Sequence, residues 1–319
     1  MCYVRVWFLI ICISINSLNV CDSIYLTPAK DIEFLYKIET KNSYISYIKI
    51  KGKKFIVKQK KEEKKQISVV KDALAAYIAK ILHIAHEVSI VPLNIYIPGK
   101  VVRSWPATIH TIALGDTIRK QKNSIYSSLQ LKQQWALAKT FAETGLTREI
   151  ITQMTWHPQL ALIVALDIII GNYDRHAGNL CYDSVTDTFC AIDMDDTFNK
   201  DLCEVAHKKL EMMIQDSSIS FTIEEVNALI QLRKTLCLLA KKYTSEHIIK
   251  KLHSYAVQAG FVSGNRLYTP SVKKKLNHYS SMIAKSWKNV RKVIGSLNKI
   301  INSGLKKNYD IKGAYYEPV

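Results

Sequence analysis

A polar loop interrupts the apolar middle of the chain and reads Gly171-Asn172-Tyr173-Asp174-Arg175-His176-Ala177-Gly178-Asn179. It places an asparagine five positions after an aspartate, and an apolar stretch that follows ends at Asp193. Carboxylate and amide oxygens are the ligands that Mg²⁺ prefers, and a carboxylate can also orient an attacking hydroxyl. The spacing therefore predicts a site in which Asp174 orients the hydroxyl while Asn179 and Asp193 hold Mg²⁺.

The segments that flank the loop support this interpretation. Residues 157–170 have the pattern of a buried helix with Pro158 in its first turn, and Leu180–Ala191 reads as a hairpin. Asp167 interrupts the apolar run of the helix, so we expect it to face the loop and accept hydrogen bonds. Taken singly, the aspartates and asparagine are also common turn residues, and His176 could be structural. A loop of this spacing between a helix and a strand-terminal aspartate is the arrangement that kinases use.

The segment from Leu166 to His176, with Gly178-Asn179 and Ala191-Ile192-Asp193, resembles the catalytic core of the phosphatidylinositol 3-/4-kinase-like superfamily. HipA-like bacterial kinases and secretory-pathway kinases share the loop pattern. The resemblance implies an ATP-dependent kinase in which Asp174 is the catalytic aspartate and His176 lies near the transferred phosphate. It further implies that Arg175 organises the catalytic loop, and that Asn179 and Asp193 are the Mg²⁺ ligands.

The N-terminal half supplies candidates for nucleotide binding. Residues 32–60 alternate like a β-meander, and Lys58 ends the third strand on the face of Ile56, where a cation could contact the ATP phosphates. The turn at 40–43, which ends at Ser43, would lie over the phosphates. The helix predicted at 68–84 offers Asp72 as the partner of the lysine, where relatives usually have glutamate. Glu62 or Glu63 are the alternatives.

The order of these patterns predicts an α+β, bilobal protein-kinase-like fold with a nucleotide between the lobes. We expect a small β-rich N-lobe at 25–115 and a mainly helical C-lobe at 116–305, followed by a tail at 306–319. Helices are predicted at 129–144, at 157–170 and after Thr222, which begins a capping box with Glu225. Asp195 stands in place of the glycine that relatives often have. It could be a further metal ligand, an acidic residue that repels a phosphorylated substrate, or an exposed acidic turn residue.

The charge of the chain bears on the acceptor. With 45 Lys and Arg against 27 Asp and Glu, the formal net charge is +18, and clusters such as 273–275 concentrate it near the C-terminus. These residues could form a solvated helix face or dock on an anionic membrane. The acceptor is expected to be an inositol phospholipid, with a protein hydroxyl as the alternative. A pseudokinase or membrane-docking module is the non-enzymatic alternative, and no specific nucleic acid is expected.

Residues 1–22 have a basic start and a short apolar core, the pattern of a secretory signal. Ten or so apolar residues are too few to span a bilayer. We therefore expect an exported protein, with an uncleaved membrane anchor or a buried N-terminal segment as the alternatives. Export permits disulfides, and Cys181 and Cys190 flank the predicted hairpin, where they could face each other or remain independent thiols.

Overall fold

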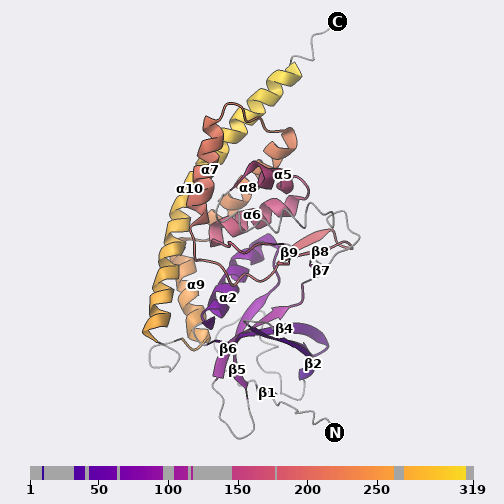
Figure 1. The fold of residues 1–319 in the computed structure, drawn as a ribbon, viewed down its shortest axis with the longest axis vertical. Helices are drawn as coiled ribbons and strands as arrows, with labels where there is room; N and C mark the ends of the chain where they lie inside the picture. Colours follow the sequence, from indigo (N-terminus) through magenta and orange to yellow (C-terminus); the bar gives the residue numbers. More distant parts are fainter. Residues whose placement is uncertain are drawn as a thin grey trace. The chain divides into compact units, whose positions relative to one another are not determined.

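The computed structural model describes residues 9–10, 32–39, 43–62, 65–95, 104–113, 116–117, 146–176, 178–261 and 269–313. The chain divides into two compact units, each built from separate stretches. The first unit comprises Met1–Tyr77, His86–Ile112 and Lys250–Asn277, and the second comprises Ile78–Ala85, Ala113–Ile249 and His278–Val319. The ribbon in Figure 1 follows the chain through both. The predicted α+β class, with a β-rich N-terminal region and a mainly helical C-terminal region, is confirmed.

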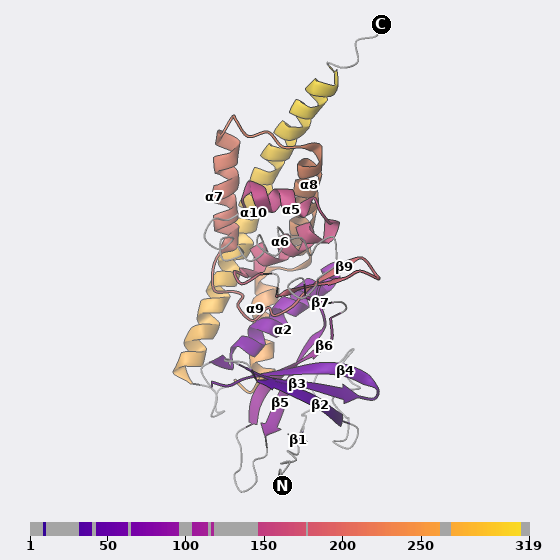
Figure 2. The ribbon, with the colours of Figure 1, turned by 45° about the vertical axis from the view of Figure 1, so that its right-hand side comes forward.

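The first unit is organised around an antiparallel six-stranded sheet in the order β1-β5-β6-β4-β3-β2. Its strands are β1 (Leu9–Ile10), β2 (Ile32–Glu39), β3 (Ser43–Ile50), β4 (Lys53–Lys60), β5 (Val88–Ile95) and β6 (Ser104–Thr111). Figure 2 shows β4, β3 and β2 side by side. Lys51 and Gly52 both have positive φ, which closes the β3–β4 hairpin in two residues and fixes its register.

One face of this sheet carries the apolar core of the first unit. Seven buried residues form it: Ile48, Ile50, Phe55, Val57, Val91, Ala107 and Ile109. Because side chains alternate along a strand, the residues next to these core residues project from the opposite face. Lys58, which follows Val57, is one of them. The predicted β-meander is therefore confirmed, and so is the expectation that Lys58 and Val57 face opposite ways.

Helix α2 (Ser68–Ala79) lies between β4 and β5 in the chain and is buried along most of its length, with Ala73 and Leu74 fully inaccessible to solvent. A 3₁₀ turn, η3 (Lys80–Leu82), extends it, and His83 ends the helical stretch with a left-handed backbone. The helix predicted at 68–84 is thus present but ends earlier. The predicted helix at 129–144 lies outside the described residues, as do the turn at 40–42 and the signal segment apart from β1.

The second unit holds a three-stranded sheet of β7 (Asp116–Thr117), β8 (Leu180–Asp183) and β9 (Thr188–Ala191). Its helices are α5 (Arg148–Met154), α6 (Pro158–Ile170), α7 (Leu202–Gln215) and α8 (Ile223–Lys242), while α9 (Ser245–Gln258) and α10 (Pro270–Gly313) contribute residues to both units. Helix α6 is apolar on nearly every side, as expected of a central helix, and is buried accordingly. No helix in the described part of the chain is long and apolar enough to span a membrane.

The capping box that begins α8 also joins two helices. The Thr222 hydroxyl accepts from the Glu225 backbone N–H, and the Glu225 carboxylate accepts from the Thr222 backbone N–H, as predicted. The same buried carboxylate accepts from Thr152 (2.7 Å) and lies 3.5 Å from the Arg148 guanidinium, both on α5. Burial raises the pKa of Glu225, but these donors and the cation outweigh it and lower the pKa overall.

Replacing Glu225 with glutamine tests these contacts between α5 and α8, because an amide NH₂ cannot accept from the N–H donors around it. A depressed carboxyl pKa contributes stability that is present above the unfolded-state pKa and lost as pH falls through the folded-state pKa. We expect Glu225→Gln to lower the free energy of unfolding by about 1–2 kcal/mol near neutral pH and by less in acid. Denaturant unfolding at both pH values measures this. Glu224→Gln, on the exposed side of the same turn, is the control. An equal loss at both pH values would contradict the account.

Candidate active site

Helix α6 ends at the point where the polar loop must turn away from it. Gly171 has a left-handed backbone (φ 63°), and its N–H and that of Asn172 donate to the carbonyl of Asp167. A Cβ atom on Gly171 would overlap the backbone carbonyl oxygen of Lys200. Glycine is therefore required for two reasons, since it adopts this φ without strain and leaves room for the crossing chain.

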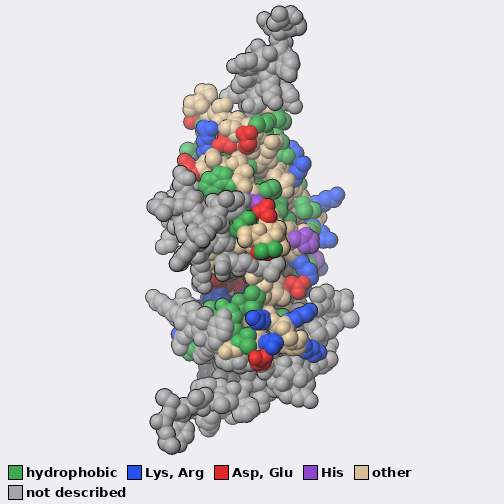
Figure 3. Space-filling model, turned by 90° about the vertical axis from the view of Figure 1, so that its right-hand side faces the viewer, with side chains coloured by type: hydrophobic (Ala, Val, Ile, Leu, Met, Phe, Trp, Pro, Cys, Tyr) green, Lys and Arg blue, Asp and Glu red, His purple; other side chains and the backbone are tan. Residues whose placement is uncertain are grey.

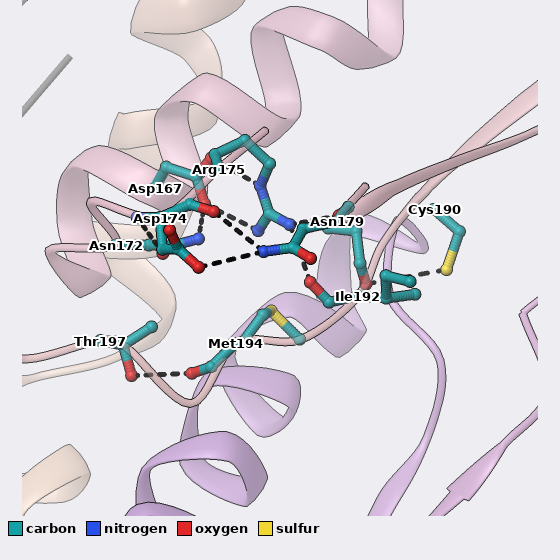
Figure 4. A network of polar contacts seen from close by, with 10 residues as sticks. Asp167, Asn172, Asp174, Arg175, Asn179, Cys190, Ile192, Met194 and Thr197 are labelled. Atoms are coloured by element: carbon teal, nitrogen blue, oxygen red, sulfur yellow. Dashed lines mark hydrogen bonds and ion pairs between the residues drawn. The ribbon is translucent and has the colours of Figure 1, made fainter. Parts of the chain in front are cut away.

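A buried ion pair holds the loop against α6 (Figure 4). The Arg175 guanidinium donates to both carboxylate oxygens of Asp167, with Nε–Oδ2 and Nη2–Oδ1 distances of 3.0 Å, and Asn172 donates to Oδ1 at 2.9 Å. Arg175 Nη1 also donates to the carbonyls of Asn179 (2.6 Å) and Ile192 (2.9 Å). One guanidinium thus ties α6 to both ends of the β8–β9 hairpin. Arg175 is 3% exposed, so it is a positioning group.

Asp174 and Asn179 lie side by side at the surface of this framework. Asn179 Nδ2 donates to the Asp174 backbone carbonyl (2.9 Å) and lies 3.3 Å from its carboxylate, while Asn172 Oδ1 accepts from the Asp174 N–H. Because the amide nitrogen of Asn179 serves Asp174, the amide oxygen is the atom that can bind a cation. The Asp174 side chain is 38% exposed and can therefore meet a substrate.

His176 is oriented toward the same carboxylate. Its Nδ1 accepts from the Gly178 N–H at 2.9 Å, so the proton of a neutral ring sits on Nε2. Nε2 lies 3.9 Å from Asp174 Oδ2, beyond hydrogen-bond length. The side chain is 30% exposed. The structure therefore places His176 beside Asp174, with Nε2 on the side of its carboxylate.

Asp193 leaves the β8–β9 ladder directly after Ile192, whose N–H donates to the Asn179 carbonyl (3.1 Å). This bond pairs Asn179 with the residue before Asp193 at the open end of the hairpin, so the two predicted metal ligands are close in the strand register. Asp193 has a positive φ of 53°, a conformation that aspartate adopts more readily than most residues. Among the described residues no group of three or more His, Cys, Asp or Glu could hold a metal.

The segment after Asp193 is anchored by buried apolar residues. Met194 and Phe198 are almost inaccessible, the Thr197 hydroxyl donates to the Met194 carbonyl, and the Phe198 N–H donates to the Ile170 carbonyl. Asp195 is only 8% exposed. Its alternative interpretation as an exposed acidic turn residue is wrong, because the anchored turn carries it inward.

Sequence reasoning missed a polar cluster next to the loop. The Tyr173 hydroxyl lies 3.5 Å from Asp196 Oδ1, and Lys200 Nζ lies 5.2 Å from the centre of the Tyr173 ring. Burial, followed by the charge of Asp196, raises the pKa of Tyr173. Burial also raises the pKa of Tyr279, on α10, to about 12. The available signal was the charged residues that follow Asp193, namely Asp195, Asp196 and Lys200, but they do not specify a partner.

The hairpin that joins the two metal-ligand candidates contains both cysteines singled out in the sequence. Cys181 and Cys190 are directly opposite each other in the β8–β9 register, as one of the two alternatives anticipated. Both thiols are free. The hairpin therefore depends on its ladder and on bonds from outside it, such as the Ala191 N–H to the Ile84 carbonyl.

The residues predicted to bind nucleotide lie in the first unit. Lys58 is half-buried and pairs with Ile45 and Thr108 in the sheet register. Ser43 is buried at the start of β3. Asp72 is buried on α2, with Oδ2 3.3 Å from His110 Nε2, a contact that sequence reasoning missed. Glu62, the alternative to Asp72, forms an ion pair with Lys65 (2.6 Å), and Glu63 lies outside the described residues.

Alanine at position 171 tests the helix-to-loop junction. We expect Gly171→Ala to lower the free energy of unfolding by at least about 2 kcal/mol, since it adds both φ strain and a backbone clash. Gly295→Ala is the matched control, because its Cβ meets no atom within 4 Å and its helical backbone accepts alanine. Denaturant unfolding of both variants measures the difference, and equal stability would contradict the junction as described.

Comparison with known proteins finds similarity at the level of solved structures. The Helicobacter pylori proinflammatory kinase CtkA is 13% identical, with 82% of this chain and 96% of that chain covered and a TM-score of 0.44. The Rio2 kinase from Chaetomium thermophilum is 11% identical over 71% of each chain (TM-score 0.31). Aminoglycoside phosphotransferase APH(4)-Ia is 13% identical, with 86% of this chain and 95% of that chain covered and a TM-score of 0.28. No family model and no curated protein sequence matches the chain. We therefore argue function from the geometry of the loop.

Proposed function

We propose that the protein is an ATP- and Mg²⁺-dependent phosphotransferase that moves the γ-phosphoryl group of ATP to a hydroxyl. The observation that carries this proposal is the buried Arg175, which binds Asp167, the Asn179 carbonyl and the Ile192 carbonyl together. Burying an ion pair is costly for stability, so its presence is better explained by the positions it fixes. Those positions belong to Asp174, Asn179 and Asp193.

In this proposal each residue has a separate task. Asp174 accepts a hydrogen bond from the acceptor hydroxyl, which aligns the oxygen for attack and gives its proton a destination. Asn179, through Oδ1, and Asp193, through its carboxylate, hold Mg²⁺, which when bound neutralises charge on the phosphates. His176 Nε2–H is available to donate to a phosphate oxygen. Arg175 and Asp167 keep these groups at fixed separations, and such preorganisation supplies most of the catalysis in phosphoryl transfer.

The ATP phosphates also need contacts outside the loop, and we assign them to Lys58, with Asp72 as its carboxylate partner and Ser43 at the start of β3. Lys58 projects from the face of the sheet opposite the apolar core. A lysine at the end of this strand can act as a point charge for phosphate oxygens.

The acceptor is assigned to the hydroxyl of an inositol phospholipid, as the resemblance to the phosphatidylinositol 3-/4-kinase-like superfamily implies. Exposed basic residues along α10 could add a peripheral membrane contact: Lys273, Lys274, Lys285, Lys288 and Arg291. Lys292 and Lys299, by contrast, contact Glu204 and Glu211 of α7. Basic, acidic and apolar side chains alternate on the described part of the face in Figure 3. A protein Ser/Thr hydroxyl remains the second candidate, and export through residues 1–22 would fit either acceptor.

Labelled ATP, offered with inositol-lipid vesicles and with a protein lysate in parallel, tests both the reaction and the acceptor. We expect Asp174→Ala and Asp193→Ala each to reduce transfer at least about a hundredfold while both variants still unfold cooperatively. Asp183→Asn, in the turn of the same hairpin, is the control and should retain activity. Activity within about threefold of wild type in either alanine variant would refute the site assignment.

A further inference from the structure

Strand β6 places two polar residues on the same face of the sheet as Lys58. Thr108 is directly opposite Lys58 in the register, and His110 is directly opposite Ile56. Opposite residues of an antiparallel pair project to the same side. Lys58, Thr108 and His110 therefore share one face, while Ala107 and Ile109 point into the apolar core.

Helix α2 brings Asp72 to this face. Its Oδ2 lies 3.3 Å from His110 Nε2, and the exposed fractions of the two side chains are 1% and 7%. The imidazole is held at both nitrogens, because Nε2 lies 2.7 Å from the Thr108 hydroxyl and Nδ1 lies 2.7 Å from His86 Nε2. Its orientation toward Asp72 is thus set by contacts with two other residues of the first unit, Thr108 and His86.

The contact offers a reason why an aspartate can stand at position 72. Aspartate is one methylene shorter than the glutamate that usually partners the phosphate-binding lysine, so its carboxylate reaches less far from the helix. A buried carboxylate is costly without a polar or charged neighbour, and the imidazole that reaches from the sheet lies within ion-pair distance of it. The Thr108 hydroxyl lies 3.5 Å from the Lys58 carbonyl, so the same group of contacts extends to the lysine's own residue.

We infer that His110, oriented by His86 and Thr108, is a positioning residue that holds the Asp72 carboxylate on the Lys58 face and so supports binding of the nucleotide phosphates. This inference rests on the proposed function. It requires that His110 act through Asp72, and this distinguishes it from a histidine that merely fills space.

A double-mutant cycle, read out by calorimetric titration of Mg²⁺·ADP, tests the inference. We expect His110→Leu to weaken Mg²⁺·ADP binding about tenfold, as loss of a polar contact with a buried carboxylate would, and His110→Gln, which keeps a polar group near Nε2, to stay within about threefold of wild type. Because His110 acts through Asp72, His110→Leu combined with Asp72→Asn should bind no more weakly than Asp72→Asn alone. If His110→Leu does not melt cooperatively, His86→Ala replaces it, with an expected weakening of about threefold.

The outcomes separate the inference from the proposed function. Additive losses in the cycle, or unchanged affinity in a folded His110→Leu or in its replacement His86→Ala, would overturn the role of His110. These failures would leave the proposed phosphotransferase standing if wild type binds Mg²⁺·ADP and Asp193→Ala does not. A wild-type protein without any Mg²⁺·ADP binding would overturn both.

Discussion

The Asp167–Arg175 ion pair is the interaction on which the rest of the site depends. Both side chains are buried, and Arg175 Nη1 also donates to two backbone carbonyls at the base of the β8–β9 hairpin. Removing one partner would leave the other charge buried and unpaired, which is far more costly than losing a surface pair. Loop, helix and hairpin are therefore coupled, and the accessible side chains of Asp174 and His176 take their positions from this buried pair.

This coupling explains the division between buried and accessible groups. Asp167, Asn172 and Arg175 satisfy one another out of solvent, whereas Asp174 and His176 keep about a third of their side chains exposed. The first group maintains geometry and the second can meet substrate. The same division recurs in the first unit, where His110 is enclosed and Lys58 is only half-buried. In the first unit, support of Lys58 by the enclosed residues is the inferred role of His110.

Local patterns in the sequence predicted the parts of this structure that depend on short-range order. The period of apolar residues located α6 and the β-meander, the Thr222–Glu225 spacing located a capping box, and the run 171–179 located the loop with Asp167 behind it. The other partners are set by tertiary contacts. Asp72 meets His110, and Glu225 meets Arg148 at a sequence separation of 77 residues, through sheet register and helix packing that no local pattern encodes. The burial of Asp195 depends likewise on where Met194 and Phe198 are anchored.

The central claim is that Asn179 and Asp193 hold Mg²⁺ for a nucleotide. The most direct measurement is the melting temperature of wild type and Asp193→Ala with ADP, each with Mg²⁺ or with a chelator. A ligand stabilises only the state that binds it, and at about a hundredfold above its Kd it contributes roughly 2.7 kcal/mol. The account predicts a clear upward shift for wild type with Mg²⁺·ADP, little shift under chelation, and little shift in Asp193→Ala under either condition. Equal shifts in the two proteins would contradict it.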